Sequence, residues 1–201
     1  MNLENSGKIY KFLLDFDKGS AYAQILDYSD LSGFDGILIQ VFNYVDEKEN
    51  SPSIIEIKKS GIMFGPAPVN KYPNIKGRGA WKLYGKDEDF NTAPPLFKFL
   101  RGLLKNNNWA DLHPWFIQDR FGDDKTGDIE SSYEDVRNLE TMILNHPDSI
   151  RVKITMMKII AAGERVADYY DLKELGYKNL YAQVVNTYYD KDTAEVLLSY
   201  L

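Results

Sequence analysis

Residues 6–30 read SGKIYKFLLDFDKGSAYAQILDYSD, and this stretch predicts a β-hairpin. Between residues 8 and 16, aromatic and aliphatic side chains alternate with charged ones at the two-residue period of a strand. The segment DFDKGS supplies a charged turn, in which Gly19 is free to adopt a positive φ. A second apolar run over residues 21–28 forms the returning strand. The fold is therefore expected to begin with two antiparallel strands.

The β pattern continues beyond the hairpin. The nearly continuous apolar run 36–45 predicts a central strand that is covered on both faces. Residues 54–57 and 80–85 predict two further short strands. Between them, the Gly- and Pro-rich segment 60–79 predicts a long loop without regular structure. Five short strands with bends at glycines indicate a curved antiparallel sheet or partial barrel in the N-terminal half.

The C-terminal half mixes helical and strand patterns. Segments 91–108 and 131–147 carry apolar residues at helical spacing, and each has a start signal, prolines in the first and a serine cap in the second. Segments 149–163 and 179–189 are interpreted as strands, because apolar and polar residues alternate in the first and apolar residues cluster in the second. Residues 190–201 predict a capped helix. The fold class is therefore expected to be α+β, with helices and two further strands in the second half.

The chain is expected to form a single domain over residues 1–201, with a weak alternative boundary at the asparagines 106–108. The segments YAQIL at Tyr22 and YAQVV at Tyr181 are alike, but their flanks differ. A duplication should repeat its neighbours at a fixed period as well, so none is expected.

Composition restricts the possible classes of protein. The chain contains no cysteine, which excludes disulfides, thiolate metal sites and a cysteine nucleophile. The first residues are polar and lack the basic-then-apolar run of a signal peptide. No apolar stretch approaches the length of a membrane span. We therefore expect a cytoplasmic protein without a membrane partner.

Charge alternates along the chain in three blocks. Residues 15–49 hold eight acids and two lysines, residues 58–86 hold seven bases and no acid, and residues 119–140 hold eight acids and three bases. A basic block between two acidic ones favours pairing of neighbouring strands within one sheet, and the acidic blocks are also able to attract a basic protein.

The sequence offers no defensible catalytic or metal motif. The two histidines, His113 and His146, each precede a proline, which is typical of loops near the ends of helices or strands. A small hydrolase with one of them as general base stays an alternative, because catalysis needs a nucleophile and a carboxylate close in space. The acidic turns 15–20 and 122–130 lack the ligand spacing of a calcium loop. No enzyme activity, cofactor or metal is therefore predicted.

A second alternative is a nucleic-acid-binding module. Cations and aromatic residues are interleaved between residues 71 and 86, a pattern that allows phosphate contacts and base stacking. The acidic flanks would repel the same backbone, so nucleic acid is an unlikely partner. The candidate contacts are Lys71, Lys76, Arg78, Trp81, Lys82, Tyr84 and Lys86.

The N-terminal half, Ser6 to Lys86, resembles the bacterial immunity protein family numbered 26 in the polymorphic toxin systems. The resemblance lies in Gly7 before the first strand, the turn 17–20, Gln24 near the end of the second strand, and a Pro-containing loop followed by a Gly and Trp strand. These motifs are structural and carry over no catalytic residue.

The resemblance implies a cytoplasmic, non-enzymatic bacterial protein that binds and neutralises a cognate toxin. An inhibitor needs a complementary surface and a few buried anchors. We expect the contacts among the acids of the first hairpin, its neighbours and the segment 119–140, which would suit a basic toxin. The candidate toxin contacts are Asp15, Asp17, Asp27, Asp30, Asp119, Asp123, Asp124, Asp128 and Glu130.

Overall fold

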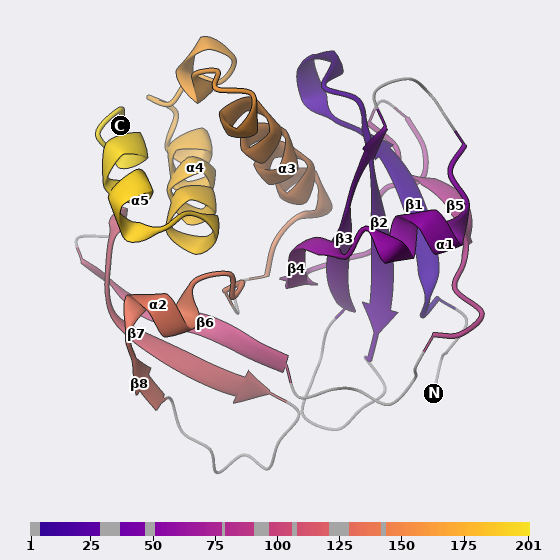
Figure 1. Cartoon of the computed structure of the whole chain (residues 1–201), viewed down its shortest axis with the longest axis horizontal. Helices are drawn as coiled ribbons and strands as arrows, with labels where there is room; N and C mark the ends of the chain where they lie inside the picture. Colours follow the sequence, from indigo (N-terminus) through magenta and orange to yellow (C-terminus); the bar gives the residue numbers. More distant parts are fainter. Residues whose placement is uncertain are drawn as a thin grey trace.

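The structure is a computed structural model of the whole chain. It describes residues 5–28, 37–46, 51–77, 79–90, 97–105, 108–120, 129–141 and 144–201, without the side chains of 97, 102–105, 108–113 and 118–120. Two antiparallel sheets and a group of helices make up the α+β fold (Figure 1). Within the described segments, no helix is long and apolar enough to cross a membrane.

The larger sheet contains the predicted hairpin. Its strands follow the order β4 (Ile62–Val69), β3 (Ile37–Asp46), β2 (Ser20–Asp27), β1 (Lys8–Leu13) and β5 (Lys82–Lys86). All neighbours are antiparallel, and irregularities in register interrupt three of the four pairings. The described strands form an open sheet that is not closed into a barrel. The prediction of an antiparallel sheet in the N-terminal half is thus confirmed, and the described strands do not close this sheet into a barrel.

Both faces of this sheet are covered. Helix α1 (Ile54–Lys59) packs Ile57 on one face, against Ile9, Tyr22 and Phe42. Helix α3 (Pro147–Ala161) covers the other face, with Ile150 and Ile154 in the largest core cluster. The alternation of a strand explains this division, because successive side chains point to opposite faces.

A second core joins the helices to one another. It packs α3 against the 3₁₀-helix η2 (Val166–Asp168) and the helices α4 (Leu175–Tyr188) and α5 (Lys191–Leu198). The smaller sheet, β6 (Phe97–Lys105), β7 (Asn108–Arg120) and β8 (Ile129–Ser131), lies below these helices in Figure 1, together with α2 (Tyr133–Val136). Leu100 of β6, Val136 of α2 and Ala182 of α4 share a core cluster.

A cluster of three polar side chains links helices α3 and α4 to the larger sheet. The Lys153 ammonium of α3 donates to Glu140 Oε2 at 3.1 Å, and the Tyr188 hydroxyl of α4 donates to Glu140 Oε1 at 2.7 Å. Lys153 and Glu140 are 1% and 3% exposed. On the side of the larger sheet, the Gly65 N–H donates to the Tyr188 hydroxyl at 3.4 Å. We call Lys153, Glu140 and the partly buried Tyr188 the buried triad, after its two buried charged groups.

Two strand predictions in the second half are wrong. Residues 149–163 lie mainly in α3, and residues 179–189 lie mainly in α4. Helix α3 packs Ile150 and Ile154 on the sheet and Met156 on the other helices, so it is apolar on opposite sides. A helix buried on two sides produces the alternation that predicted a strand.

The opposite error occurs at residues 91–108. The segment from Phe97 to Lys105 is strand β6, where a helix was predicted. Phe99 and Leu100 are both buried, in different core clusters on the two sides of the strand, so the leucine spacing reflects burial on both faces. The described strands of the second half of the chain are therefore β6, β7 and β8, which form the smaller sheet.

Three shorter segments also differ from the predictions. The predicted strand 54–57 begins helix α1, which Ser53 and Glu56 start with a capping box. The predicted loop 60–79 contains β4, which pairs with β3. Within the predicted helix 131–147, the described residues form helix α2, with Ser132 as its N-cap as expected, and the segment ends at Pro147, where α3 begins. The hairpin, the central strand β3, strand β5 and the C-terminal helix α5 are confirmed.

Candidate functional site

The tip of the β1–β2 hairpin is the starting point of the candidate site. It forms the short 3₁₀-turn η1 (Asp15–Asp17), in which Phe16 and Asp17 have φ angles of 56° and 53°. Two consecutive non-glycine residues in the left-handed region are unusual and cost free energy. The Leu14 N–H closes the turn by donating to the Gly19 carbonyl at 2.9 Å. This turn holds the Phe16 side chain 47% exposed.

Helix α3 and the residues before α4 hold the tip in place through Asp15. The Asp15 N–H donates to Thr155 Oγ1 at 3.1 Å, and the Asp15 carboxylate accepts from the Tyr170 hydroxyl at 2.9 Å. Arg151 Nε lies 3.2 Å from Asp15 Oδ1, an ion pair whose angle is unfavourable for a hydrogen bond. Residues far apart in sequence therefore fix one turn.

Aromatic rings surround the exposed Phe16. Its ring centroid lies 5.2 Å from that of Tyr169 and 4.9 Å from that of Tyr170, in edge-to-face arrangements. The Tyr170 ring lies 5.0 Å from that of Tyr177 at the start of α4. Such pairs add stabilisation beyond the area they bury.

These residues line an open cavity of about 390 Å³, which we call the hairpin-tip cleft. The volume falls in the range of about 300–1,000 Å³ that is typical of ligand pockets. Its aromatic walls are Phe16, Tyr169, Tyr170 and Tyr177, and its charged groups are Asp15, Arg151 and Asp171. Large rings beside a few charged groups are the composition of protein-binding hot spots.

Charge at the rim of the cleft is organised by Lys18. Its ammonium donates to Glu164 at 2.7 Å and lies 4.7 Å from the centroid of the Tyr169 ring. The Tyr169 hydroxyl also donates to Glu164. The hydrogen bond from Lys18 lowers the pKa of the Glu164 carboxyl, so this rim stays ionised at neutral pH. Burial, followed by the Asp15 charge, raises the pKa of Tyr170, which keeps its hydroxyl protonated as a donor.

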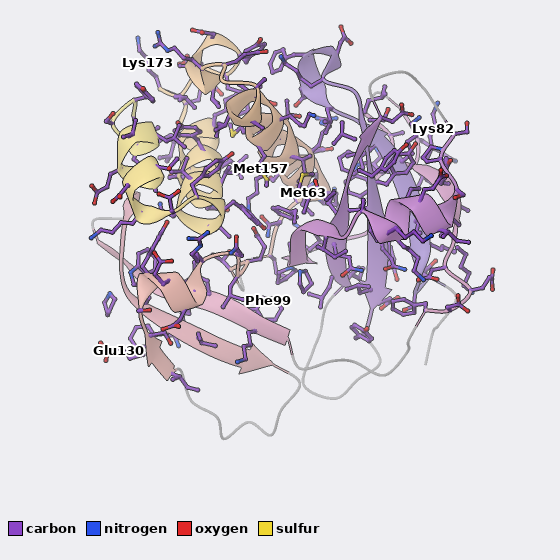
Figure 2. All side chains as sticks on the ribbon, in the orientation of Figure 1. Met63, Lys82, Phe99, Glu130, Met157 and Lys173 are labelled. Atoms are coloured by element: carbon purple, nitrogen blue, oxygen red, sulfur yellow. The ribbon has the colours of Figure 1, made fainter. Side chains whose placement is uncertain are left out.

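The predicted acidic contacts whose side chains are described do not form one surface. Asp15 and Asp17 lie at the hairpin tip, and Asp27 lies at the other end of β2. Eight residues of strand span about 25 Å. Asp27 is 6% exposed and accepts from the Tyr72 hydroxyl, so it offers little free surface. Glu130 of β8 is exposed at the edge of the smaller sheet, far from the tip in Figure 2.

The side chains of the remaining predicted acids lie outside the described residues. Asp119 belongs to β7, where its backbone pairs with Lys98, but its side chain is outside the described residues. The others that lie outside the described residues are Asp30, Asp123, Asp124 and Asp128.

The basic segment offers less to nucleic acid than its sequence predicted. Trp81 is 1% exposed and stacks on Phe12 with ring centroids 4.1 Å apart, so it is a core residue and cannot stack on a base. Tyr84 packs against Tyr22, and its hydroxyl donates to the Pro52 carbonyl. Arg78 lies outside the described residues. The exposed cations that remain along the segment are Lys71, Lys76, Lys82 and Lys86. Figure 2 shows Lys82 at the opposite side of the molecule from Glu130.

The histidines do not assemble a catalytic site in the part of the chain that can be described. His146 is the N-cap of α3 and accepts from the Asp148 N–H at 3.2 Å. The side chain of His113 lies outside the described residues. Among the described residues, no group of histidines and acids is arranged to hold a metal ion.

Sequence reasoning identified Asp15 in the cleft and missed its other residues, while the predicted Asp17 lies at the hairpin tip but lines a neighbouring cavity. Phe16 was assigned to the apolar face of the first strand, and Arg151 to the polar face of a predicted strand. The pair Tyr169–Tyr170 next to Asp171 is visible in the sequence as an aromatic and acidic turn. Its proximity to the hairpin tip depends on helix packing, which no local pattern encodes.

Comparison of the chain with protein-family models, with curated proteins and with solved structures gave no match in any of the three.

Proposed function

We propose that this chain is a bacterial immunity protein that binds a cognate toxin in the cytoplasm and neutralises it by stoichiometric association, without catalysis. The observation that carries the proposal is the hairpin-tip cleft, in which an exposed phenylalanine lies in a left-handed turn that Thr155 of α3 and Tyr170, before α4, hold in place. Strained conformations persist where the surrounding structure determines them, and they cluster at functional sites.

The polar groups at the base of the cleft support a binding role. The Asp15 carboxylate is engaged by Arg151 and Tyr170, so it orients its neighbours within the protein. Such a pre-organised surface lowers the entropy lost on association. The resemblance of residues 6–86 to an immunity family agrees with a binder that performs no chemistry.

The first test is co-purification of the tagged protein with the products of neighbouring genes, combined with growth rescue of cells that express a toxic neighbour. We expect a one-to-one complex and restored growth. The protein failing to bind or to protect against any toxic neighbour would contradict the proposal.

Substitution of Phe16 locates the interface. Phe16→Ala removes an exposed ring, and we expect at least about tenfold weaker toxin binding if Phe16 is an anchor. Leu83→Ala on β5 is the matched control, because Leu83 is 59% exposed and lies outside the cleft. Equal protection by Phe16→Ala and the wild type would remove the cleft from the interface.

A further inference from the structure

The hairpin-tip cleft has the chemistry of a site for a cationic side chain. Its walls are aromatic rings, whose faces attract cations electrostatically. Phe16 contributes an exposed ring, and Tyr177 also lines the cleft, beside Tyr170. The question is whether the charges in the lining favour a cation or an anion.

The one cation in the lining is already engaged. Arg151 Nε lies beside the Asp15 carboxylate, and its Nη1 packs so closely on Gly79 that a Cβ there would lie 2.2 Å from it. Arg151 and Asp15 therefore balance each other at the base of the cleft. An incoming anion would have to compete with Asp15 for the same guanidinium.

Asp171 is the acid in the lining that remains. It is exposed, its Oδ1 accepts from the Lys173 N–H at 3.0 Å, and it takes part in no ion pair among the described residues. The lining thus carries one uncompensated negative charge next to exposed aromatic surface. Both features favour a cation.

The protein already binds a cation in this way at the rim. Lys18 lies over the Tyr169 ring and donates to Glu164, which combines a ring face with a carboxylate. Phe16 and Asp171 both line the cleft and are both exposed, so they offer the same two groups, a ring and a carboxylate.

We propose that the hairpin-tip cleft captures an arginine side chain of the protein partner, with its guanidinium against the Phe16 ring and beside the Asp171 carboxylate. Arginine suits the site because its planar group stacks on aromatic faces and pairs with carboxylates. This inference rests on the proposed function for the identity of the partner, while the cleft chemistry is testable by itself.

The experiment uses the full ¹⁵N-labelled chain, titrated with N-acetyl-arginine amide and followed by NMR. N-acetyl-citrulline amide is the matched control probe, because it replaces the charged guanidinium with a neutral urea of similar shape. We expect saturable shifts in the amides of residues 15–18 and 169–177 with the arginine probe and far smaller ones with citrulline. Equal responses to both probes, or arginine shifts confined to other regions, would overturn the inference.

Variants assign the contacts. Phe16→Leu is expected to weaken arginine binding about fivefold, and Asp171→Asn about two- to fivefold. Tyr200→Leu is the control, since Tyr200 is 54% exposed and lies outside this cleft. Unchanged binding by both cleft variants would also reject the site.

Growth rescue separates this inference from the proposed function. Protection by the wild type without arginine binding would reject only the cation site. Arginine binding by a chain that neutralises no neighbouring toxin would reject only the immunity role.

Discussion

At the scale of single residues, the buried triad shows how this chain tolerates charge in its interior. Lys153 and Glu140 are almost fully buried and hydrogen-bonded to each other. Lys153 also lies 5.3 Å from the centroid of the Phe64 ring. Burying a charge is costly unless it is paired, so each member depends on the others.

Removing Lys153 is expected to be strongly destabilising. Lys153→Met leaves the Glu140 carboxylate buried without its ammonium, which costs about 3–5 kcal/mol of unfolding free energy. Urea denaturation monitored by circular dichroism measures the change. Lys18→Met removes a partner of the exposed Glu164 and is expected to cost far less. Similar losses for the two variants would contradict the buried role of Lys153.

The Tyr188 hydroxyl is expected to make the free energy of unfolding depend on pH in the alkaline range. Burial, and then the Glu140 charge, raises the pKa of its hydroxyl well above the ordinary 10.0. The folded protein therefore keeps this proton at a pH where the unfolded chain has released it. The contribution is fully present below about pH 10, and the free energy of unfolding falls as the pH rises further.

Denaturation between pH 8.5 and 11.5 tests this dependence. Tyr188→Phe is expected to be less stable than the wild type at pH 8.5 but to show a shallower fall above pH 10. Tyr200→Phe, at an exposed position, is expected to keep the wild-type slope. An unchanged slope in Tyr188→Phe would show that this hydroxyl does not contribute.

At the scale of elements, the conformation of the first hairpin depends on its own turn and on contact with strand β3. The turn needs Gly19, whose φ is 97° and whose Cα approaches the end of β3. A Cβ there would lie 2.8 Å from the Asp46 carbonyl oxygen. The hairpin tip is therefore constrained both by backbone conformation and by a neighbouring strand.

A pair of glycine substitutions separates these two constraints. Gly77 also has a positive φ, of 86°, but nothing within 4 Å of an added Cβ. Gly77→Ala is expected to cost about 1–2 kcal/mol from backbone strain alone. Gly19→Ala adds the clash with Asp46, so its melting temperature should fall clearly further. Equal melting temperatures for the two variants would mean that β3 moves aside without cost.

At the scale of the whole molecule, helix α3 joins the larger sheet to the other helices. Ile154 is fully buried between α3 and the larger sheet, and Met156 is buried among the helices. A shared helix favours cooperative unfolding, which is also what the prediction of one domain over residues 1–201 requires; that prediction stays to be tested.

Hydrogen exchange tests that cooperativity. Ile154→Ala is expected to lower the free energy of unfolding by about 2–5 kcal/mol through loss of packing and a residual cavity. The most protected amides of β2 and of α4 should lose the same amount. Loss of protection in α4 with full retention in β2 would instead divide the chain into two units.

Some features of this protein follow from the sequence alone. The hairpin alternates at one period around a glycine turn, and the C-terminal helix starts at Asp190, whose carboxylate accepts from the Thr193 N–H. Each of these signals is local. The acidic tip residues Asp15 and Asp17 were also found from charge and turn position.

Tertiary structure alone decided the rest. The letters YAQ form strand in β2 and helix in α4, because packing on several sides overrides weak local propensity. Periodicity reports only which face is buried, so it fails for α3, α4 and β6, which are covered on more than one side. The hairpin-tip cleft depends on that same packing, since it joins Phe16 to tyrosines more than 150 positions away in the chain.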